Sequence, residues 1–467
     1  MTSHLIRAAA VLLLASPSAF AQNIDPFPQP IAATEGVIRV NIADFASIPA
    51  IDGVAARMML LADEPGTRRL FVNDMRGPLY SVSYDGKTVT RYHDVNAANS
   101  GVSVQHQGRE RGVQSFAFHP QFNQAGTRGF GKFYTYTDSS NMQPAPDFVP
   151  AGGMNTHDTV LLEWTAKNPA AATYDGGAPR ELIRLRQPFA NHNAGHLAFN
   201  PNATPGSADF GLLYMGVADG GSGGDPLNMA QNLNSAFGKI FRIDPLGANS
   251  ANKKYGIPPG NPFVNDNNPQ TLGEIYAYGV RNPQRFGWDP KNGNLFLADI
   301  GQNIVEELSL VTAGANLGWN TWESSFRFIS RTEIKLDGTR ADPKMVYPLV
   351  EYDHRDPLLG VNNNDVAITG TIVYRGTAIP QLANLVLFGD NPSGEVFYIN
   401  ADRLPSGGQD GMRRVLFNSG GAAKTLMELV KEKNPAATRV DLRFGIGAGN
   451  QVFLLNKQDG TIRVLRP

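Results

Sequence analysis

The chain lacks cysteine: none of its 467 residues is one. That excludes disulfides, thiolate metal sites, iron–sulfur clusters and covalently attached c-type haem. An excess of charge of one sign is also missing, because the formal net charge is −1. We therefore expect no nucleic-acid partner and no binding to a charged membrane surface.

Long apolar runs are scarce as well. The apolar stretch at residues 8–15 is too short to span a bilayer. It follows Arg7 and precedes Ala19-Phe20-Ala21, the arrangement of a signal peptide and its cleavage site. The alternative is an uncleaved amphipathic N-terminal helix. We expect residues 1–21 to be a signal peptide and the mature protein to be periplasmic or secreted, without membrane insertion.

What the chain does contain is a repeated strand–turn–strand pattern with glycine in the turn. In each copy the first strand ends at an acid or an amide, a residue type that initiates turns. The six copies are residues 70–74 and 77–82, 132–138 and 159–164, 212–219 and 238–243, 294–299 and 307–311, 385–390 and 394–399, and 452–456 and 460–465.

A second motif, apolar-small-aromatic-x-Pro, precedes several of these hairpins. It occurs at residues 116–120, 197–201 and 286–290, with a looser copy at 443–447. Small residues between apolar ones suit a strand packed closely around an axis, and the proline ends the strand.

Together the repeats predict an all-β fold: a six-bladed β-propeller of four-stranded antiparallel blades, forming one domain over residues 22–467. Each unit has about 74 residues, against about 40–50 in WD40 and kelch repeats, so the surplus should be loops. A pair of β-sandwiches and a β-helix are the alternatives. A sandwich rarely shows six copies of one hairpin, and a β-helix repeats at shorter intervals. We expect a strand near residues 37–42 to join the last strands and close the ring.

Ionisable residues stand five positions before the start of four inner-strand motifs. They are Arg111 with Glu110 beside it, His192, Arg281 with Asn282 after it, and Arg439. Equivalent positions in a ring converge on one end of its channel, where a few polar groups make a ligand site. Arginines suit a planar anion, and His192 suits a general base. The alternative is that these are solvated loop charges or packing partners.

A possible cation site follows Asp299. Gly301 and Gln302 lie in a turn whose carbonyls could face a ligand, and Glu307 is close in sequence. Oxygen atoms of this kind are what Ca²⁺ prefers, although acidic turns are also common without metal. No zinc-binding pattern occurs, and the Gly-rich loop 220–225 lacks the Lys-Ser/Thr of a phosphate-binding loop.

Taken together, these segments resemble the soluble PQQ-dependent glucose/sorbosone dehydrogenase family, which includes the aldose sugar dehydrogenases. Residues 110–122 look like its "ERGLLGLAFHPDF" segment, 191–197 like "H-x-G-G-x-L", 278–283 like "GxRNP", and 299–319 like "DxGxxxxDEIN…GxNYGW". The similarity runs from about residue 50 to the C-terminus.

The resemblance implies a propeller with pyrroloquinoline quinone (PQQ) at the top of its channel. His192 would be the base that takes the proton of the sugar C1 hydroxyl, and Arg281 would stabilise the developing oxyanion. Glu110, Arg281, Asn282 and Arg439 would contact the cofactor. The carbonyls of Gly301 and Gln302 would hold a Ca²⁺ that polarises the quinone, and Glu307 would belong to a second Ca²⁺ site.

The chain also departs from the family pattern. Asn191 replaces an Asp that often precedes the catalytic histidine. Pro392 and Ser393 stand where some members carry a cofactor-binding Lys, and Asp441 where some carry a second Arg. Two further functions therefore stay open: a cofactor-free propeller that binds carbohydrate or protein, and a Ca²⁺-dependent lactonase or hydrolase. In a dehydrogenase, a chain without attached haem would pass electrons to a separate acceptor.

Overall fold

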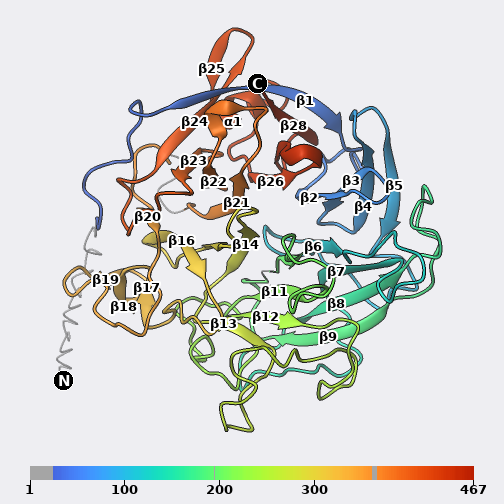
Figure 1. The fold of residues 1–467 in the computed structure, drawn as a ribbon. Helices are drawn as coiled ribbons and strands as arrows, with labels where there is room; N and C mark the ends of the chain where they lie inside the picture. The colour runs from blue at the N-terminus through green and yellow to red at the C-terminus, as the bar shows by residue number, and fades with distance from the viewer. Residues whose placement is uncertain (1–24, 194, 360–364) are drawn as a thin grey trace, which may run out of the picture.

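The computed structural model describes residues 25–193, 195–359 and 365–467 of a chain built almost entirely of β-strands. The expected signal peptide at residues 1–21 lies outside the described residues. The strands form sheets that surround a central axis (Figure 1). The all-β class is therefore confirmed. None of the helices in the described part of the chain combines the length and apolarity that crossing a membrane requires.

Three sheets are independent, and each has four antiparallel strands. One contains β6 (Val113–Phe118), β7 (Lys132–Ser139), β8 (His157–Thr165) and β9 (Arg180–Gln187). The next contains β10 (Leu197–Phe199), β11 (Leu213–Val217), β12 (Lys239–Ile243) and β13 (Ile275–Tyr278). The third contains β14 (Pro283–Trp288), β15 (Leu295–Asp299), β16 (Val305–Val311) and β20 (Val350–Asp353).

The largest sheet has 13 strands and divides into three antiparallel groups. Parallel pairing of β1 with β24 and of β2 with β26 joins the groups. The first group is β2 (Met58–Glu64), β3 (Arg69–Asp74), β4 (Pro78–Ser83) and β5 (Val89–Asp94). The second is β21 (Ile368–Tyr374), β22 (Leu385–Asp390), β23 (Val396–Asn400) and β24 (Arg413–Ser419), with β25 (Ala422–Lys424) at its edge. The third is β1 (Ile38–Ser47), β26 (Arg443–Ile446), β27 (Val452–Leu455) and β28 (Thr461–Arg466).

All six predicted hairpins are present. They are the antiparallel pairs β3–β4, β7–β8, β11–β12, β15–β16, β22–β23 and β27–β28. The strand before each hairpin lies nearest the axis, and neighbouring units contact one another around it: β2 with β6, β6 with β10, β11 with β14, β14 with β21, β21 with β26, and β26 with β2. The units thus follow one another in a closed circle (Figure 1).

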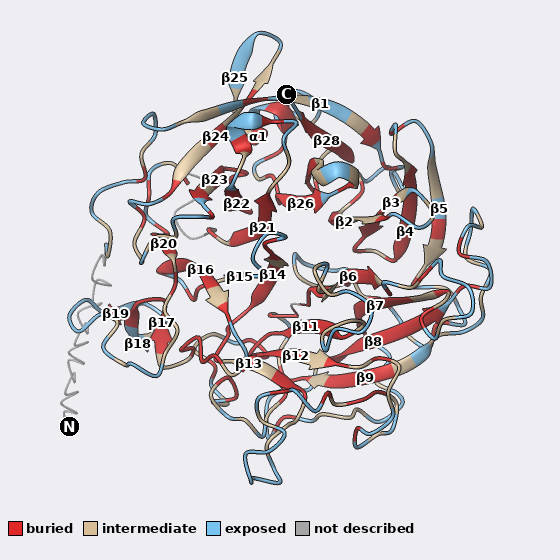
Figure 2. Cartoon of the chain, in the orientation of Figure 1, coloured by how far each residue is buried: buried red, intermediate tan, exposed pale blue. Residues whose placement is uncertain are grey.

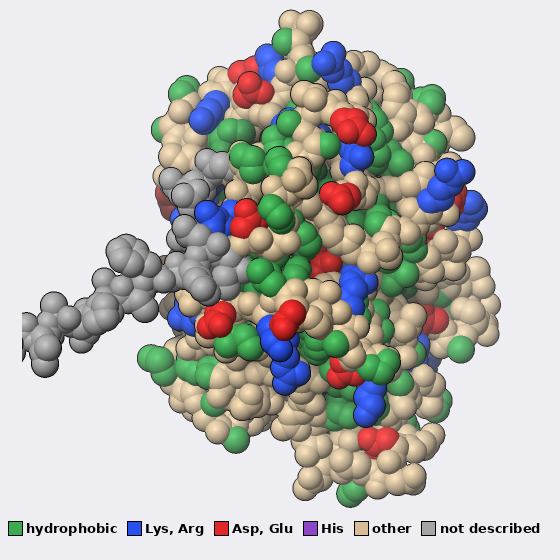
Figure 3. Space-filling view, turned by 90° about the vertical axis from the view of Figure 1, so that its left-hand side faces the viewer, with side chains coloured by type: hydrophobic (Ala, Val, Ile, Leu, Met, Phe, Trp, Pro, Cys, Tyr) green, Lys and Arg blue, Asp and Glu red, His purple; other side chains and the backbone are tan. Residues whose placement is uncertain are grey.

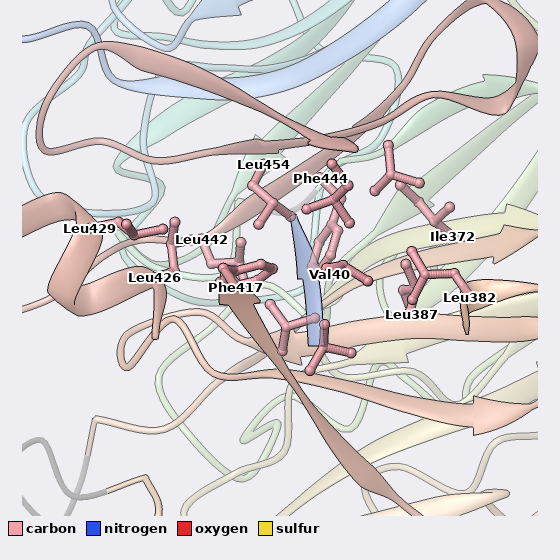
Figure 4. Close-up of a cluster of buried hydrophobic side chains, with 14 of the residues drawn as sticks. Val40, Ile372, Leu382, Leu387, Phe417, Leu426, Leu429, Leu442, Phe444 and Leu454 are labelled. Atoms are coloured by element: carbon pink, nitrogen blue, oxygen red, sulfur yellow. The ribbon is translucent and has the colours of Figure 1, made fainter. Parts of the chain in front are cut away.

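The circle closes as the sequence predicted. β1 pairs antiparallel with β28, so that Ile42 lies opposite Leu465. Val40 of β1 packs in a buried cluster with side chains from the C-terminal units, including Phe417 and Leu454 (Figure 4). A ring whose last unit joins both ends of the chain has no strand free to fray.

Close packing at the axis explains the small residues of the inner-strand motif. A Cβ on Gly287 of β14 would lie 2.4 Å from the carbonyl oxygen of Thr371 on β21. A Cβ on Gly445 of β26 would lie 2.6 Å from the Cβ of Leu61 on β2. The strands are buried while the connecting loops are exposed (Figure 2). The core thus fixes the inner strands, and with them the loops that precede these strands.

Smaller elements decorate the ring. A three-stranded sheet, β17 (Trp322–Glu323), β18 (Phe326–Ser330) and β19 (Glu333–Lys335), lies between β16 and β20 in sequence. A short helix in the C-terminal region, α1 (Leu426–Lys431), is capped reciprocally by Thr425 and Glu428. Two short 3-10 turns are η1 (Pro380–Leu382) and η2 (Ala448–Asn450). On the face seen in Figure 3, basic and acidic side chains are interspersed.

Candidate active site at the end of the central channel

A cavity of about 220 Å³ opens where the innermost strands begin. Each of the six units supplies part of its wall, mostly from the residues just before or within its first strand. The lining residues are Met59, Arg109, Glu110, Gln114, His192, Arg281, Asn282, Gln284, Ile300, Gly301, Gln302, His354, Asp365, Val366, Ala367, Asn391, Arg439, Asp441, Arg443 and Lys457. The structure thus brings Glu110, His192, Arg281, Asn282, Gly301, Gln302 and Arg439 together at one place. Glu307 and Arg111 do not line the cavity.

His192 is held on both sides of its ring. Nδ1 lies 2.6 Å from Oδ1 of Asp219 at the base of β11, and Nε2 lies 2.9 Å from a guanidinium nitrogen of Arg281. The Asp219 carboxylate accepts a hydrogen from Nδ1, which leaves Nε2 as the acceptor. The backbone N–H of His192 donates to Glu110 Oε2 at 2.6 Å. The side chain is only 4% exposed.

Asp219 is the positioning partner that the sequence did not assign. Its second oxygen accepts the indole N–H of Trp319 at 2.8 Å, and its first also accepts the Gly221 N–H. Burial alone would raise the pKa of this carboxyl, but the hydrogen bond from His192 and the charge of Arg281 hold the pKa below its ordinary value. Asp219 is therefore ionised and fixes the tautomer and orientation of His192.

Arg281 and Asn282 are fixed through their backbone. Both N–H groups donate to the carboxylate of Asp299, at 2.8 and 2.7 Å. The Arg281 guanidinium donates to the Ile300 carbonyl at 3.0 Å and lies over the Trp319 ring. Oδ1 of Asn282 is buried and has no hydrogen-bond partner among the described residues. A buried amide oxygen without a donor is uncommon, and a bound water, ion or ligand in the cavity would satisfy it.

The acids at the ends of the second strands, which are the first strands of the predicted hairpins, explain how the site is built. Like Asp299, three others accept a backbone N–H from the loop before the first strand of their own unit: Asp74 from Arg57, Asp138 from Gln105, and Asp390 from Ala367. Asp219 instead contacts its loop through the His192 side chain. The sequence predicted turn residues at these positions. The structure adds that each acid ties down a loop at the channel end.

Arg111 is the one member of the predicted register that points elsewhere. Its Nε donates to Asp138 at 2.6 Å, so the neighbouring Glu110 faces the cavity in its place. The expectation that Arg111 belongs to the convergent set was therefore wrong. Glu110 ends a turn and Arg111 follows it before β6 begins, and of these two neighbours only Glu110 lines the channel end.

Arg439 lines the cavity but is already paired with acids. Its Nε donates to Asp441 at 2.7 Å, and its guanidinium also pairs with Asp365. Arg109 reaches the same Asp365 at 2.6 Å. These contacts neutralise part of the charge at this side of the cavity.

Two buried cationic residues in the wall were not found from the sequence. Arg443 is 3% and Lys457 8% exposed. Burial lowers the pKa of Arg443 to about 10 and lowers the pKa of Lys457 well below its ordinary value, the latter with help from the charge of Arg443. Arg443 could have been predicted, because it is the first residue of the looser copy of the inner-strand motif.

The predicted metal residues separate into two places. Gly301 and Gln302 line the cavity, and no donor among the described residues is hydrogen-bonded to their carbonyl oxygens. A Cβ on Gly301 would lie 1.6 Å from the Val305 carbonyl, so this turn requires glycine. Glu323 Oε1 accepts the backbone N–H groups of residues 302–305, at 2.9 to 3.1 Å, and shapes the loop.

Glu307 lies behind this loop. One of its carboxylate oxygens, Oε2, is buried without a partner, as are Oε2 of Glu323 and Oγ of Ser324. Burial and the neighbouring Asp299 raise the pKa of Glu307 well above its ordinary value. The described residues contain no group of three or more His, Cys, Asp or Glu side chains arranged to hold a metal. Any cation here would therefore depend on backbone carbonyls as well as carboxylates.

Comparison with known proteins places this geometry in a family. The model of the family described as Glucose / Sorbosone dehydrogenase matches residues 56–406. The HIPL1 protein of Arabidopsis thaliana is 26% identical over 449 residues, which cover 89% of this chain and 62% of that protein. The human Hedgehog-interacting protein is 26% identical over 344 residues, 73% of this chain and 42% of that protein. The chain thus spans about two fifths to three fifths of these relatives.

A solved structure shares the fold. The PQQ-bound form of Aldose Sugar Dehydrogenase from Streptomyces coelicolor superimposes with a TM-score of 0.57 at 18% identity, covering 92% of this chain and 98% of that one. The resemblance found in the motifs is therefore confirmed at the level of the family. On the family match, which spans most of the chain, this protein belongs to the glucose/sorbosone dehydrogenase family.

Proposed function

We propose that this protein is a PQQ-dependent dehydrogenase that oxidises an aldose or a related alcohol in the channel-end cavity. The fold that carries it is proposed to be one six-bladed propeller over residues 22–467, with the large sheet counted as three blades. Its substrate is a small sugar, and its electrons leave to a separate acceptor. Residues 1–21 would direct it to the periplasm or the exterior.

The observation that carries the proposal is the His192–Asp219 pair. Because Nδ1–H donates to the carboxylate, Nε2 is the acceptor of the ring, and His192 lines the cavity. A sugar whose C1 hydroxyl takes the place of the Arg281 N–H at Nε2 would lose its proton to that nitrogen. Arg281 lies 2.9 Å from the same Nε2, so its charge is next to the oxygen that loses the proton. A fixed cation there stabilises the developing negative charge without reorganisation.

The cavity wall fits PQQ, a planar quinone with three carboxylates. Five cationic side chains line it, Arg109, Arg281, Arg439, Arg443 and Lys457, against three acidic ones, Glu110, Asp365 and Asp441. The partnerless Asn282 oxygen is a polar atom that a ligand would engage. Bound PQQ would supply the two-electron acceptor chemistry that amino-acid side chains lack. Arg281, Asn282, Glu110 and Arg439 would hold it.

Calcium fits the turn beside this wall. Gly301 and Gln302 line the cavity, their carbonyls accept no hydrogen bond from the described residues, and such oxygens match the ligands that Ca²⁺ takes. Bound there, Ca²⁺ would act as a Lewis acid toward the cofactor. The partnerless oxygens of Glu307, Glu323 and Ser324 favour a second Ca²⁺ site behind the loop.

A cofactor-free binding propeller is the second candidate. The pairing of Arg439 with Asp441 and Asp365 favours it, because a paired arginine has less charge to offer a cofactor. Similarity to a protein named Hedgehog-interacting protein also favours it. A Ca²⁺-dependent lactonase, the third possibility, would use the same histidine without a quinone.

Reconstitution tests the proposal. The purified protein is loaded with PQQ and Ca²⁺, and dye reduction is followed with a panel of aldoses and alcohols. We expect activity that needs both cofactors and falls by about 10²- to 10⁴-fold in His192→Ala. The control is His106→Ala, which removes an exposed histidine. Lactone turnover without PQQ would indicate the third function, and failure to bind PQQ would contradict the first.

A further inference from the structure

Lys457 is a buried cation that the family pattern does not account for. It stands directly after β27, at the tip of the last hairpin, and its side chain lines the cavity. Nζ donates to the Arg109 carbonyl at 2.9 Å. An ammonium group has three hydrogens to donate, and this contact uses one of them.

The acid near this charge, Asp441, offsets it only in part. No carboxylate in the described part of the chain forms an ion pair with Lys457, and the oxygens of Asp441 are engaged by Arg439 and Gln458. In the other five units the second strand ends in aspartate, but here Asn456 takes that position and bonds only within its own turn. Buried cations are normally paired, so an anion is expected at this point.

The charged side chains around Lys457 also favour the binding of an anion. The charged groups nearest to it are Arg443 on β26, Arg439 and Asp441 in the loop before β26, and Arg57 before β2. Three of these four are cationic. A ligand with a carboxylate in this part of the cavity would relieve their mutual repulsion.

One backbone segment separates Lys457 from the position where, by the family resemblance, some members carry a lysine. In this chain Pro392 and Ser393 occupy that position, and the Ser393 hydroxyl donates to Asp390 at 2.5 Å. The N–H of Val440 donates to the Pro392 carbonyl at 2.8 Å, and the N–H of Lys457 donates to the Val440 carbonyl at 3.3 Å. Two consecutive backbone hydrogen bonds thus connect the two positions.

We propose that Lys457 binds a carboxylate of PQQ and replaces, from the neighbouring blade, the lysine that some relatives carry at the Pro392–Ser393 position. The inference rests on the proposed function. It also predicts that the apo protein tolerates loss of this lysine, because the variant no longer buries an unpaired cation.

The test measures PQQ affinity directly, by fluorescence quenching with Ca²⁺ present and no sugar. Lys457→Met should weaken PQQ binding by about 10- to 100-fold, since a charge-assisted contact is lost. Lys457→Arg should stay within a few fold of wild type, and so should Lys87→Met, which changes an exposed lysine. The trimethyl ester of PQQ should bind wild type and Lys457→Met equally, because it has no carboxylate to pair.

Three results would overturn the inference. Unchanged PQQ affinity in Lys457→Met would show that no carboxylate meets this residue. Equal losses for PQQ and its ester would mean that Lys457 only shapes the cavity. Wild type that binds no PQQ would remove the proposed function, and this inference with it. Thermal melting of the apo variants checks folding, and we expect Lys457→Met to melt no lower than wild type.

Discussion

The Nδ1 atom of His192 lies 2.6 Å from Oδ1 of Asp219, and the other oxygen of that carboxylate is held by the indole of Trp319 at 2.8 Å. The histidine and its partner come from different strands of one unit: His192 precedes β10 and Asp219 follows β11. The geometry that we propose for catalysis is thus fixed by the pairing of two strands at the axis.

Asp219→Asn tests that relationship. An amide in place of the carboxylate can donate to Nδ1, which favours the wrong tautomer and leaves Nε2 protonated. We expect kcat/KM for the aldose to fall by about 10²- to 10⁴-fold while PQQ affinity changes little. Asp138→Asn is the matched control, because the equivalent acid in that unit pairs with Arg111 and not with a histidine. If Asp219→Asn kept full activity, the histidine would not depend on Asp219.

Asn282→Leu separates stability from cofactor binding. Its backbone N–H still donates to Asp299, and the buried partnerless oxygen disappears. The free energy of unfolding of the apo protein should therefore stay within about 1 kcal/mol of wild type or rise. PQQ affinity should fall by about 10-fold or more. Denaturant titration and PQQ binding measure the two quantities, and a large loss of apo stability would show that the oxygen has a partner within the protein.

Glu307→Gln tests the second calcium site. In wild type, Ca²⁺ at 100 times its dissociation constant should add about 2.7 kcal/mol to the free energy of unfolding. The variant removes the charge of a buried carboxylate with a partnerless oxygen, so it should be at least as stable as wild type in EGTA. It should gain less from Ca²⁺. Equal gains in both proteins would place the ion elsewhere.

Acid stability should depend on buried histidines. Burial lowers the pKa of His119 to about 4, and its Nδ1 accepts the Gln121 N–H at 3.1 Å, so the folded state holds it neutral. Its pKa in the unfolded chain is near 6.5. Its stabilising effect is therefore complete above about pH 6.5 and is lost as the pH falls toward 4.

His119→Asn, which copies Asn200 in the equivalent motif, should flatten this part of the stability curve by about 1–3 kcal/mol. The free energy of unfolding at pH 7 and pH 4.5 measures the difference. His106→Asn, at an exposed position, should leave the slope unchanged. A slope unaltered by His119→Asn would mean that this histidine is protonated in the folded state.

Most of the fold could be predicted from the sequence repeats. Six hairpins and the closing strand could be placed because the alternation and the strand-ending acids recur with each unit. The three-stranded sheet β17–β19 could not, because it is an insertion in one unit with no repeated counterpart.

A site residue could be predicted where it stands at a fixed sequence distance before an inner strand. His192, Arg281 and Arg439 follow that rule, but neighbours such as Glu110 and Arg111 differ only in which side of the backbone they face. The sequence did not predict the roles proposed for Asp219 and Lys457, because these roles arise from contacts between strands and loops far apart in sequence. Such contacts produce no regular spacing in the local sequence from which they could be predicted.

The central claim, that sugar oxidation takes place beside His192, is tested most directly by a single turnover. Protein loaded anaerobically with Ca²⁺ and one equivalent of PQQ is mixed with an aldose, and the absorbance of the quinone is followed. The account predicts complete reduction in wild type, slower reduction of a sugar deuterated at C1, and reduction about 10²- to 10⁴-fold slower in His192→Ala. Stoichiometrically bound PQQ that no aldose or alcohol reduces would contradict it.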